Sequence, residues 1–135
     1  MPQPTLDDIF NDGRRLPLGD DLRQAVGAWL AHLVAQRGAG DNTIDAYARD
    51  IRQFLGWLRV YLDRAPCLGD LGGLKAKSFR AFMASRRRQE VSSRSIARTM
   101  SALRAFYRWL ETEETLKNRA VLQVALPKKA HAIPK

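Results

Sequence analysis

Hydrophobic residues recur at helical spacing along most of the chain, three or four positions apart, with polar residues between them. The four longest stripes predict amphipathic helices at about residues 20–37, 42–62, 75–89 and 93–114. Two shorter apolar stretches predict a brief turn at residues 68–71 and a last turn or helix at residues 120–126. No stretch gives a convincing β-strand, so the pattern predicts an all-α fold.

Capping residues and helix breakers indicate where these elements begin and end. The candidate N-caps are Asp20 or Asp21 for the first helix, Asn42 for the second and Ser92 or Ser93 for the fourth. Residues 1–19 are rich in proline and glycine and show little periodicity, which is typical of an irregular leader. We expect one helical domain at residues 20–116, followed at residues 117–135 by a last helical turn and a linker.

The helix predicted at residues 93–114 has two different faces. Its apolar stripe comprises Ile96, Met100, Leu103, Tyr107 and Leu110. At 100° per residue, a second face spans about 120° and comprises Arg94, Arg98, Ser101, Arg104 and Arg108. The second predicted helix adds Arg49, Arg52 and Arg59 on one side. One face therefore suits a protein core, and the other favours an anionic ligand.

The charge balance narrows the choice of ligand. The 23 Lys and Arg residues outnumber the 14 Asp and Glu residues, which gives a net charge of +9. Residues 1–40 hold four basic and five acidic residues, so the whole surplus lies in residues 41–135. Such a surplus favours a polyanionic partner, such as nucleic acid or an anionic membrane. No apolar run approaches the roughly 18 residues that span a bilayer, so we expect no membrane partner.

Several kinds of site are excluded by residue type and spacing. Cys67 is the only cysteine, which rules out an internal disulfide and favours a reduced cytoplasm. His32 and His131 lie far apart, without carboxylates or thiols at metal-ligand spacing. Tyr47 and Tyr107 fall on or beside apolar stripes, where packing is their expected role. We therefore expect no catalytic residue, metal or cofactor in this chain.

The second and fourth predicted helices resemble each other. A shift of 52 positions aligns Thr43 with Ser95, Ile44 with Ile96, Arg52 with Arg104, Phe54 with Phe106, Trp57 with Trp109 and Leu58 with Leu110. Any two amphipathic helices share some apolar positions by coincidence, which accounts for part of this similarity. The matching Arg and Trp residues, in contrast, indicate two helices with similar roles.

These two segments also carry motifs of a known family. The pattern T-x-x-x-Y-x-x-D-x-x-x-F-x-x-W-L is met at residues 43–58, and SALRxFYxWL at residues 101–110. Together they resemble the N-terminal core-binding domain of tyrosine recombinases (the phage integrase family), of the XerC/XerD type. The resemblance covers residues 21–135. It departs from the family at Asn118-Arg119, where many relatives have Asn-Pro.

The resemblance implies a SAM-like bundle of four to five helices, arranged as two crossed helical hairpins, that forms one half of a clamp around duplex DNA. The second and fourth helices would approach the major groove. Strand breakage, in chromosome dimer resolution or DNA integration, would depend on a following catalytic domain, so we expect this chain alone to bind DNA without cutting it. Partner recombinase subunits and a cytoplasmic, nucleoid-associated location are also implied.

The candidate DNA contacts follow from the basic faces. Arg94, Arg98 and Arg104 are the first choices for groove or phosphate contacts, supported by Thr43, Arg49, Arg52, Ser93, Ser101 and Arg108. Lys128 and Lys129 lie in an extended tail that can follow a phosphate backbone, although a solubilising tail explains them equally well. The alternative function is a helical protein-interaction adaptor. A helix-turn-helix repressor fits less well, because the fourth helix is long and follows no short turn.

Overall fold

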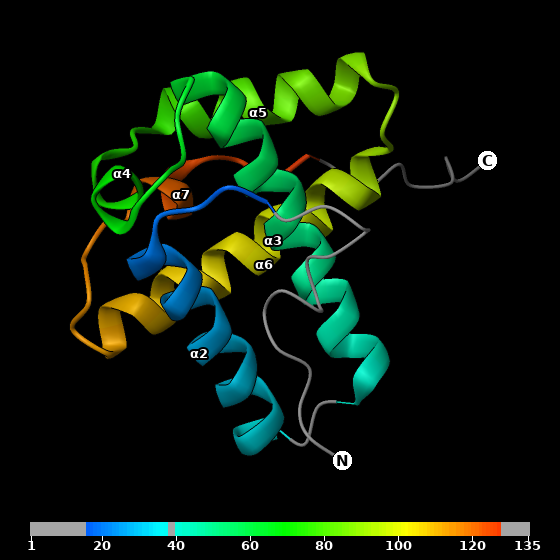
Figure 1. Ribbon diagram of the computed structural model, residues 1–135. Coiled ribbons are helices and arrows are strands. Elements are labelled where there is room, and N and C mark those ends of the chain that lie inside the picture. Colours follow the sequence, from blue (N-terminus) through cyan, green and yellow to red (C-terminus); the bar gives the residue numbers. More distant parts are fainter. Residues whose placement is uncertain (1–15, 38–39, 128–135) are drawn as a thin grey trace.

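The computed structural model describes residues 16–37 and 40–127, and this part of the chain contains α-helices and no β-strand (Figure 1). The all-α prediction is therefore confirmed. The helices are α2 (Asp20–Arg37), α3 (Asp41–Leu62), α4 (Leu68–Gly73), α5 (Ala76–Arg88), α6 (Ser93–Thr112) and α7 (Ala120–Gln123).

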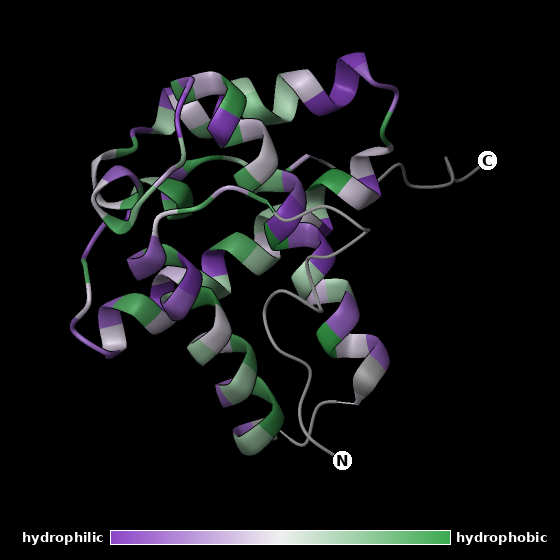
Figure 2. Cartoon of the chain, in the orientation of Figure 1, coloured by the Kyte–Doolittle hydropathy of each residue, from purple (hydrophilic) through white to green (hydrophobic). Residues whose placement is uncertain are grey.

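The helices form two hairpins, α2 with α3 and α5 with α6, and α3 crosses α6 in the middle of the molecule (Figure 1). Their apolar faces meet there, while most polar residues lie outside (Figure 2). The largest fully buried side chains include Trp29, Phe54, Phe79, Phe82 and Phe106. The ring centroids of Phe54 and Phe79 are 5.6 Å apart, and those of Trp29 and Phe106 are 5.1 Å apart. Aromatic packing across the hairpins therefore dominates the core.

Some helix ends differ from the predictions. Asn42 is not the N-cap of α3, because the backbone is already helical at Asp41 and Gly40 takes the cap position with φ −71° and ψ 165°. Ser92, and not Ser93, caps α6, since its Oγ accepts a hydrogen bond of 3.1 Å from the Ser95 amide. The last helix ends at Gln123 and not near residue 126, because the backbone of Val124 is extended.

Segments beside the predicted domain also take part in the core. Leu18 is buried, and the Gly19 amide donates a 2.8 Å hydrogen bond to the Pro66 carbonyl. At the C-terminal end of the domain, Val121 and Val124 are buried where α7 packs on α5 and α6. The packed body therefore extends beyond residues 20–116 at both ends.

The short helix α4 is held by a cluster of polar contacts around Asp70. Its carboxylate accepts a hydrogen bond of 2.8 Å from the amide of Cys67, the N-cap residue, and forms an ion pair with Arg64. The hydrogen bond from Arg64, together with those from Cys67, lowers the pKa of Asp70 to about 2. Cys67 is thus part of a helix cap, with its thiol donating to the same carboxylate at 3.3 Å.

The internal similarity of α3 and α6 extends to their environment. Many equivalent positions, 52 residues apart, have the same degree of burial, although Thr43 is exposed where Ser95 is half-buried. Buried on both helices are Ile44 and Ile96, Phe54 and Phe106, and Leu58 and Leu110, whereas Trp57 and Trp109, and Arg52 and Arg104, are half-buried. The two helices therefore present equivalent faces to the core that they share.

Candidate nucleic-acid interface

The polar face of α6 forms an exposed row of basic and hydroxyl side chains. Arg94, Arg98, Ser101 and Arg108 are exposed, while the apolar stripe on the opposite side, from Ile96 to Leu110, is buried. The helical repeat of 3.6 residues explains this division, because positions three, four and seven residues apart share one face. The row extends from the first turn of the helix at Arg94 to Arg108 near its end, with the largest gap between Ser101 and Arg108.

A groove of about 370 Å³ runs between this row and the first turns of α3. Its walls comprise Asn42, Thr43, Ala46 and Tyr47 from α3, and Arg98, Ser101 and Ala102 from α6. The structure thus brings together three of the predicted site residues, Thr43, Arg98 and Ser101, although Thr43 is more than 50 positions from the other two. Tyr47 also packs edge-on against Trp29, with ring centroids 5.5 Å apart.

Arg98 is anchored by a buried carboxylate, Asp50, which was not among the predicted site residues. Asp50 on α3 is 2% exposed, and its Oδ2 accepts a 3.1 Å hydrogen bond from Arg98 Nε. Its Oδ1 accepts hydrogen bonds from Arg98 Nη2 at 3.1 Å and from Thr99 Oγ1 at 3.0 Å. The hydrogen bonds to Asp50 raise the pKa of the Arg98 guanidinium. The sequence signal for this buried carboxylate is its position, because Asp50 lies between Ala48 and Ile51, which are both apolar.

Two predicted arginines lie outside the exposed row. Arg104 is half-buried, and its Nη2 donates a 2.7 Å hydrogen bond to the Val124 carbonyl, so that it joins α6 to the chain after α7. Arg52 is half-buried in a different hollow, between α3 and α5, that Gly56, Trp57 and Arg86 also line. Both residues lie at the edge of their helix's polar face, where the neighbouring elements cover them.

The remaining predicted contacts have varied surroundings. Arg49 is exposed on α3 and, in the described part of the chain, forms no ion pair with Asp45. Ser93 is half-buried at the first residue of α6, next to the cap. Lys128 and Lys129 lie outside the described residues.

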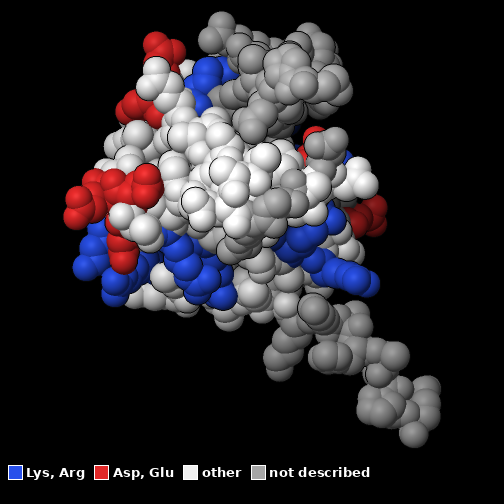
Figure 3. Space-filling model, turned by 90° about the horizontal axis from the view of Figure 1, so that it is seen from below, with Lys and Arg blue, Asp and Glu red and all other residues white. Residues whose placement is uncertain are grey.

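The charges on one face of the molecule are unevenly distributed. Seen from below the view of Figure 1, most Lys and Arg side chains gather in groups along the lower half of the face, and most acidic side chains lie at its left, where some adjoin a basic group (Figure 3). The centre of the face is uncharged (Figure 3). Separate basic groups of this kind suit a ligand whose own charges are repeated along its length.

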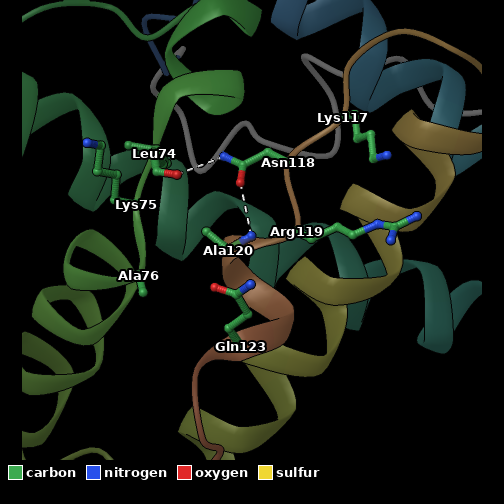
Figure 4. A pocket seen from close by; sticks show the side chains of 8 residues that line it. All are labelled: Leu74, Lys75, Ala76, Lys117, Asn118, Arg119, Ala120 and Gln123. Atoms are coloured by element: carbon green, nitrogen blue, oxygen red, sulfur yellow. Dashed lines mark hydrogen bonds between the residues drawn. The ribbon is translucent and has the colours of Figure 1, made fainter.

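Another hollow, of about 510 Å³, lies between the start of α5 and α7 and also has basic side chains (Figure 4). Lys75 stands on one side, and Lys117 and Arg119 stand on the other and point away from it (Figure 4). Arg119 is paired with Glu111 at 2.9 Å. Asn118 closes the middle, where its Oδ1 accepts a 3.0 Å hydrogen bond from the Ala120 amide. These cations do not converge, so the α3–α6 groove is the better candidate site.

The tyrosine on α6 is part of the core, as expected from its position in the stripe. Tyr107 is 2% exposed, and its hydroxyl donates a 2.9 Å hydrogen bond to the Leu71 carbonyl. Burial raises the pKa of its phenol, which opposes formation of a nucleophilic phenolate. Within the described residues, no cluster of His, Cys, Asp or Glu is suited to hold a metal ion, and no helix has the length and hydropathy to cross a membrane.

The chain is similar in sequence to several proteins named tyrosine recombinase XerC. It is 44% identical over 115 residues to a protein named tyrosine recombinase XerC from Methylobacterium nodulans, an alignment that covers 85% of this chain and 35% of the relative. The XerC of Agrobacterium fabrum is 34% identical over 85% of the chain and 36% of the relative. That of Rhizobium meliloti is 32% identical over 99% of the chain and 41% of the relative.

The chain thus spans between 35% and 41% of the length of these relatives. No solved structure matches it. Residues 26–114, which contain α3 to α6 and most of α2, match the family described as phage integrase, N-terminal SAM-like domain. This chain belongs to that family, and it is an XerC-like N-terminal domain of the tyrosine recombinases.

Proposed function

We propose that the surface formed by α3 and α6 binds duplex DNA, and that the chain is the DNA-binding part of a site-specific recombinase. One observation carries this proposal: Thr43, Arg98 and Ser101 meet in a single groove, which continues into the exposed arginine row of α6. Hydroxyl and guanidinium groups are the usual protein contacts to phosphates and base edges. The net charge of +9 supports the same ligand.

The length of the row fits the dimensions of DNA. Arg94 and Arg108 are fourteen residues apart, which is about 21 Å along an α-helix. The major groove of B-DNA is about 12 Å wide. A helix that crosses that groove obliquely would therefore place Arg94 and Arg108 near the two phosphate backbones, and Arg98 and Ser101 nearer to the base edges.

The proposal extends to the longer protein that the relatives indicate. In it, this domain would hold one side of the DNA, and a catalytic region elsewhere would break and rejoin the strands for chromosome dimer resolution or DNA integration. The buried hydroxyl of Tyr107 makes this tyrosine of α6 unsuited to act as the nucleophile. Partner recombinase subunits would bind the neighbouring half of the site, in the cytoplasm at the nucleoid.

Salt-dependent DNA binding tests the proposal. The affinity of the 135-residue chain for an unrelated duplex and for a palindromic duplex with two half-sites is measured by fluorescence anisotropy over a series of salt concentrations. We expect both duplexes to bind at low salt. Arg94→Ala should reduce the slope of log affinity against log salt by about 0.9, because each phosphate contact releases about that many counterions.

Arg80→Ala is the matched control, because Arg80 is exposed on α5, which contributes no residue to the groove. We expect its slope to remain close to that of the wild type. Absence of binding to both duplexes at low salt would contradict the proposal and favour the protein-interaction adaptor. Equal slopes for the wild type and Arg94→Ala would remove Arg94 from the phosphate contacts.

A further inference from the structure

The guanidinium of Arg98 has two different edges. The edge formed by Nε and Nη2 is occupied by Asp50, through hydrogen bonds of 3.1 Å to Oδ2 and 3.1 Å to Oδ1. The other edge, formed by Nη1 and the second hydrogen of Nη2, has no hydrogen-bond partner within the described residues. The side chain of Arg98 is nevertheless 54% exposed and lines the α3–α6 groove. Arg98 therefore combines a fixed position with an unused pair of donors.

We propose that Arg98 is the arginine that reads the DNA sequence, by contacting a guanine, and that Asp50 is its positioning residue; this inference rests on the proposed DNA-binding function. Two parallel N–H donors match the O6 and N7 acceptors of guanine in the major groove. Such a contact discriminates between bases only where the fork is held in one direction. Asp50 fixes that direction, because it is 2% exposed and its Oδ1 is also held by Thr99 Oγ1.

The charge of Asp50 favours a base over a phosphate as the partner of Arg98. A buried carboxylate in direct contact offsets the positive charge of the guanidinium, and with it the attraction to a phosphate. Arg49, Arg94 and Arg108 are exposed and, in the described part of the chain, form no ion pair. They are better suited to neutralise phosphates, which leaves the directional contact to Arg98.

The surroundings of Arg98 are consistent with this division. The Thr43 and Ser101 residues that line the same groove have small hydroxyl side chains, which allow close approach of a base and can bond to either donors or acceptors. Asp50 and Arg98 lie on different helices, 48 positions apart in the chain. The direction of the fork is therefore fixed by the crossing of α3 and α6.

Selection from a random duplex pool provides the first test. The wild-type chain is used to select from a pool with 20 randomised base pairs, and we expect at least one strongly enriched guanine. Arg98→Lys keeps the positive charge and the ability to pair with Asp50 but removes the fork. The ratio of its affinities for guanine and for the other bases at that position should fall by about 5- to 150-fold. The slope of its log affinity against log salt should stay like that of the wild type.

A modified base identifies the contact itself. Replacement of the enriched guanine by 7-deazaguanine removes the N7 acceptor, and it should weaken binding of the wild type more than that of Arg98→Lys, whose single ammonium also pairs with Asp50. Arg94→Ala should remain sensitive to the modified base, although its salt slope is reduced. Equal sensitivity of the wild type and Arg98→Lys would overturn the assignment of Arg98 to guanine.

Asp50→Asn tests the positioning role. Asparagine preserves the shape of the side chain and can accept a hydrogen bond from Thr99, but it lacks the charge that holds the guanidinium. We expect discrimination at the enriched guanine to fall as in Arg98→Lys, with the helical circular dichroism retained. Because loss of the buried carboxylate can impair folding, Thr99→Val serves as a second variant. It removes the hydrogen bond from Thr99 Oγ1 to Asp50 Oδ1 and should lower the discrimination by less than Asp50→Asn does.

The outcomes separate this inference from the proposed function. If the wild type binds duplex DNA and the selected pool shows no enriched base, DNA binding stands and the reading role of Arg98 is wrong. The same conclusion follows if folded Asp50→Asn keeps full discrimination. If the wild type binds no duplex at all, the proposed function itself fails.

Discussion

At the scale of single residues, the carbonyl oxygen of Leu71 shows how buried polar groups are used in this molecule. It accepts hydrogen bonds from Tyr107 Oη at 2.9 Å and from Asn118 Nδ2 at 3.0 Å. Both donors lie more than 30 positions away in the sequence. The end of α4 is thereby joined to α6 and to the segment before α7.

Tyr107→Phe should lower the free energy of unfolding by about 0.5–1.5 kcal/mol, the usual net value of one buried hydrogen bond. The cost is limited because the Leu71 carbonyl keeps its bond from Asn118. Urea unfolding followed by circular dichroism measures the change. Tyr61→Phe is the matched control: Tyr61 is 47% exposed, and its hydroxyl only receives a 3.5 Å contact from Ser78 Oγ. Equal losses in the two variants would contradict the role assigned to Tyr107.

Residue positions on the polar faces were largely predictable, but the contacts of the residues were not. The helical period placed Arg94, Arg98, Ser101 and Arg108 on one exposed face. It placed Arg104 there as well, and only the return of the chain after α7 shows that this guanidinium bonds to Val124. Asp50 was visible as part of a motif, yet its partner Arg98 lies on another helix, which periodicity within one helix does not reveal.

At the scale of elements, helix α6 combines a capped start with a long amphipathic body. Ser92 accepts the hydrogen bond from the Ser95 amide, and Glu113 follows the last residue, Thr112. The chain then turns at Glu114, which has a left-handed φ of 57°. The first turn of this helix carries Arg94, so its order affects the proposed interface directly.

Ser92→Ala should destabilise the protein by about 0.5–2 kcal/mol, because the Ser95 amide loses its capping acceptor. The control is Ser93→Ala, at the next position, which removes a hydroxyl that takes no part in the cap. We expect this control to change the free energy of unfolding by less than about 0.5 kcal/mol. Thermal and urea unfolding of both variants distinguish the two positions. A larger loss for Ser93→Ala would show that the cap lies one residue later.

The existence of the long helices was predictable because their apolar stripes are regular. The positions of their ends were less predictable, because each end depends on only a few capping residues. Asn42 is a common capping residue, and Gly40 lies only two positions before it. The choice between them rests on backbone angles at Gly40, where φ is −71° and ψ is 165°. Side-chain preference alone does not determine these angles.

At the scale of the whole molecule, Asn118 joins the start of α7 to residues 71–74, which lie more than 40 positions earlier in the chain. Its Nδ2 donates to the carbonyls of Leu71 at 3.0 Å and Leu74 at 2.8 Å, and its Oδ1 accepts from the Ala120 amide at 3.0 Å (Figure 4). The side chain thus connects α4, the start of α5 and the start of α7. The sequence alone shows only that this asparagine stands where the family pattern has one, before the departure at Arg119.

Asn118→Ala should lower the free energy of unfolding by about 2–3 kcal/mol, because the Leu74 carbonyl and the Ala120 amide lose these bonds inside the fold. Gln123→Ala is the control: Gln123 is exposed on α7, and we expect a change of less than about 0.5 kcal/mol. Urea titrations of both variants provide the comparison. A loss in Asn118→Ala no larger than in this control would show that the three bonds contribute little to stability.

The α3–α6 groove belongs to neither helix alone, since one wall comes from residues 42–47 and the other from residues 98–102. A synthetic peptide with the sequence of α6 would keep the arginines but lose both the opposite wall and the carboxylate that orients one of them. Protein engineers who wish to retarget this surface would need to randomise both stretches of the gene in one combined library. Separate libraries would sample a groove with only half of its walls changed.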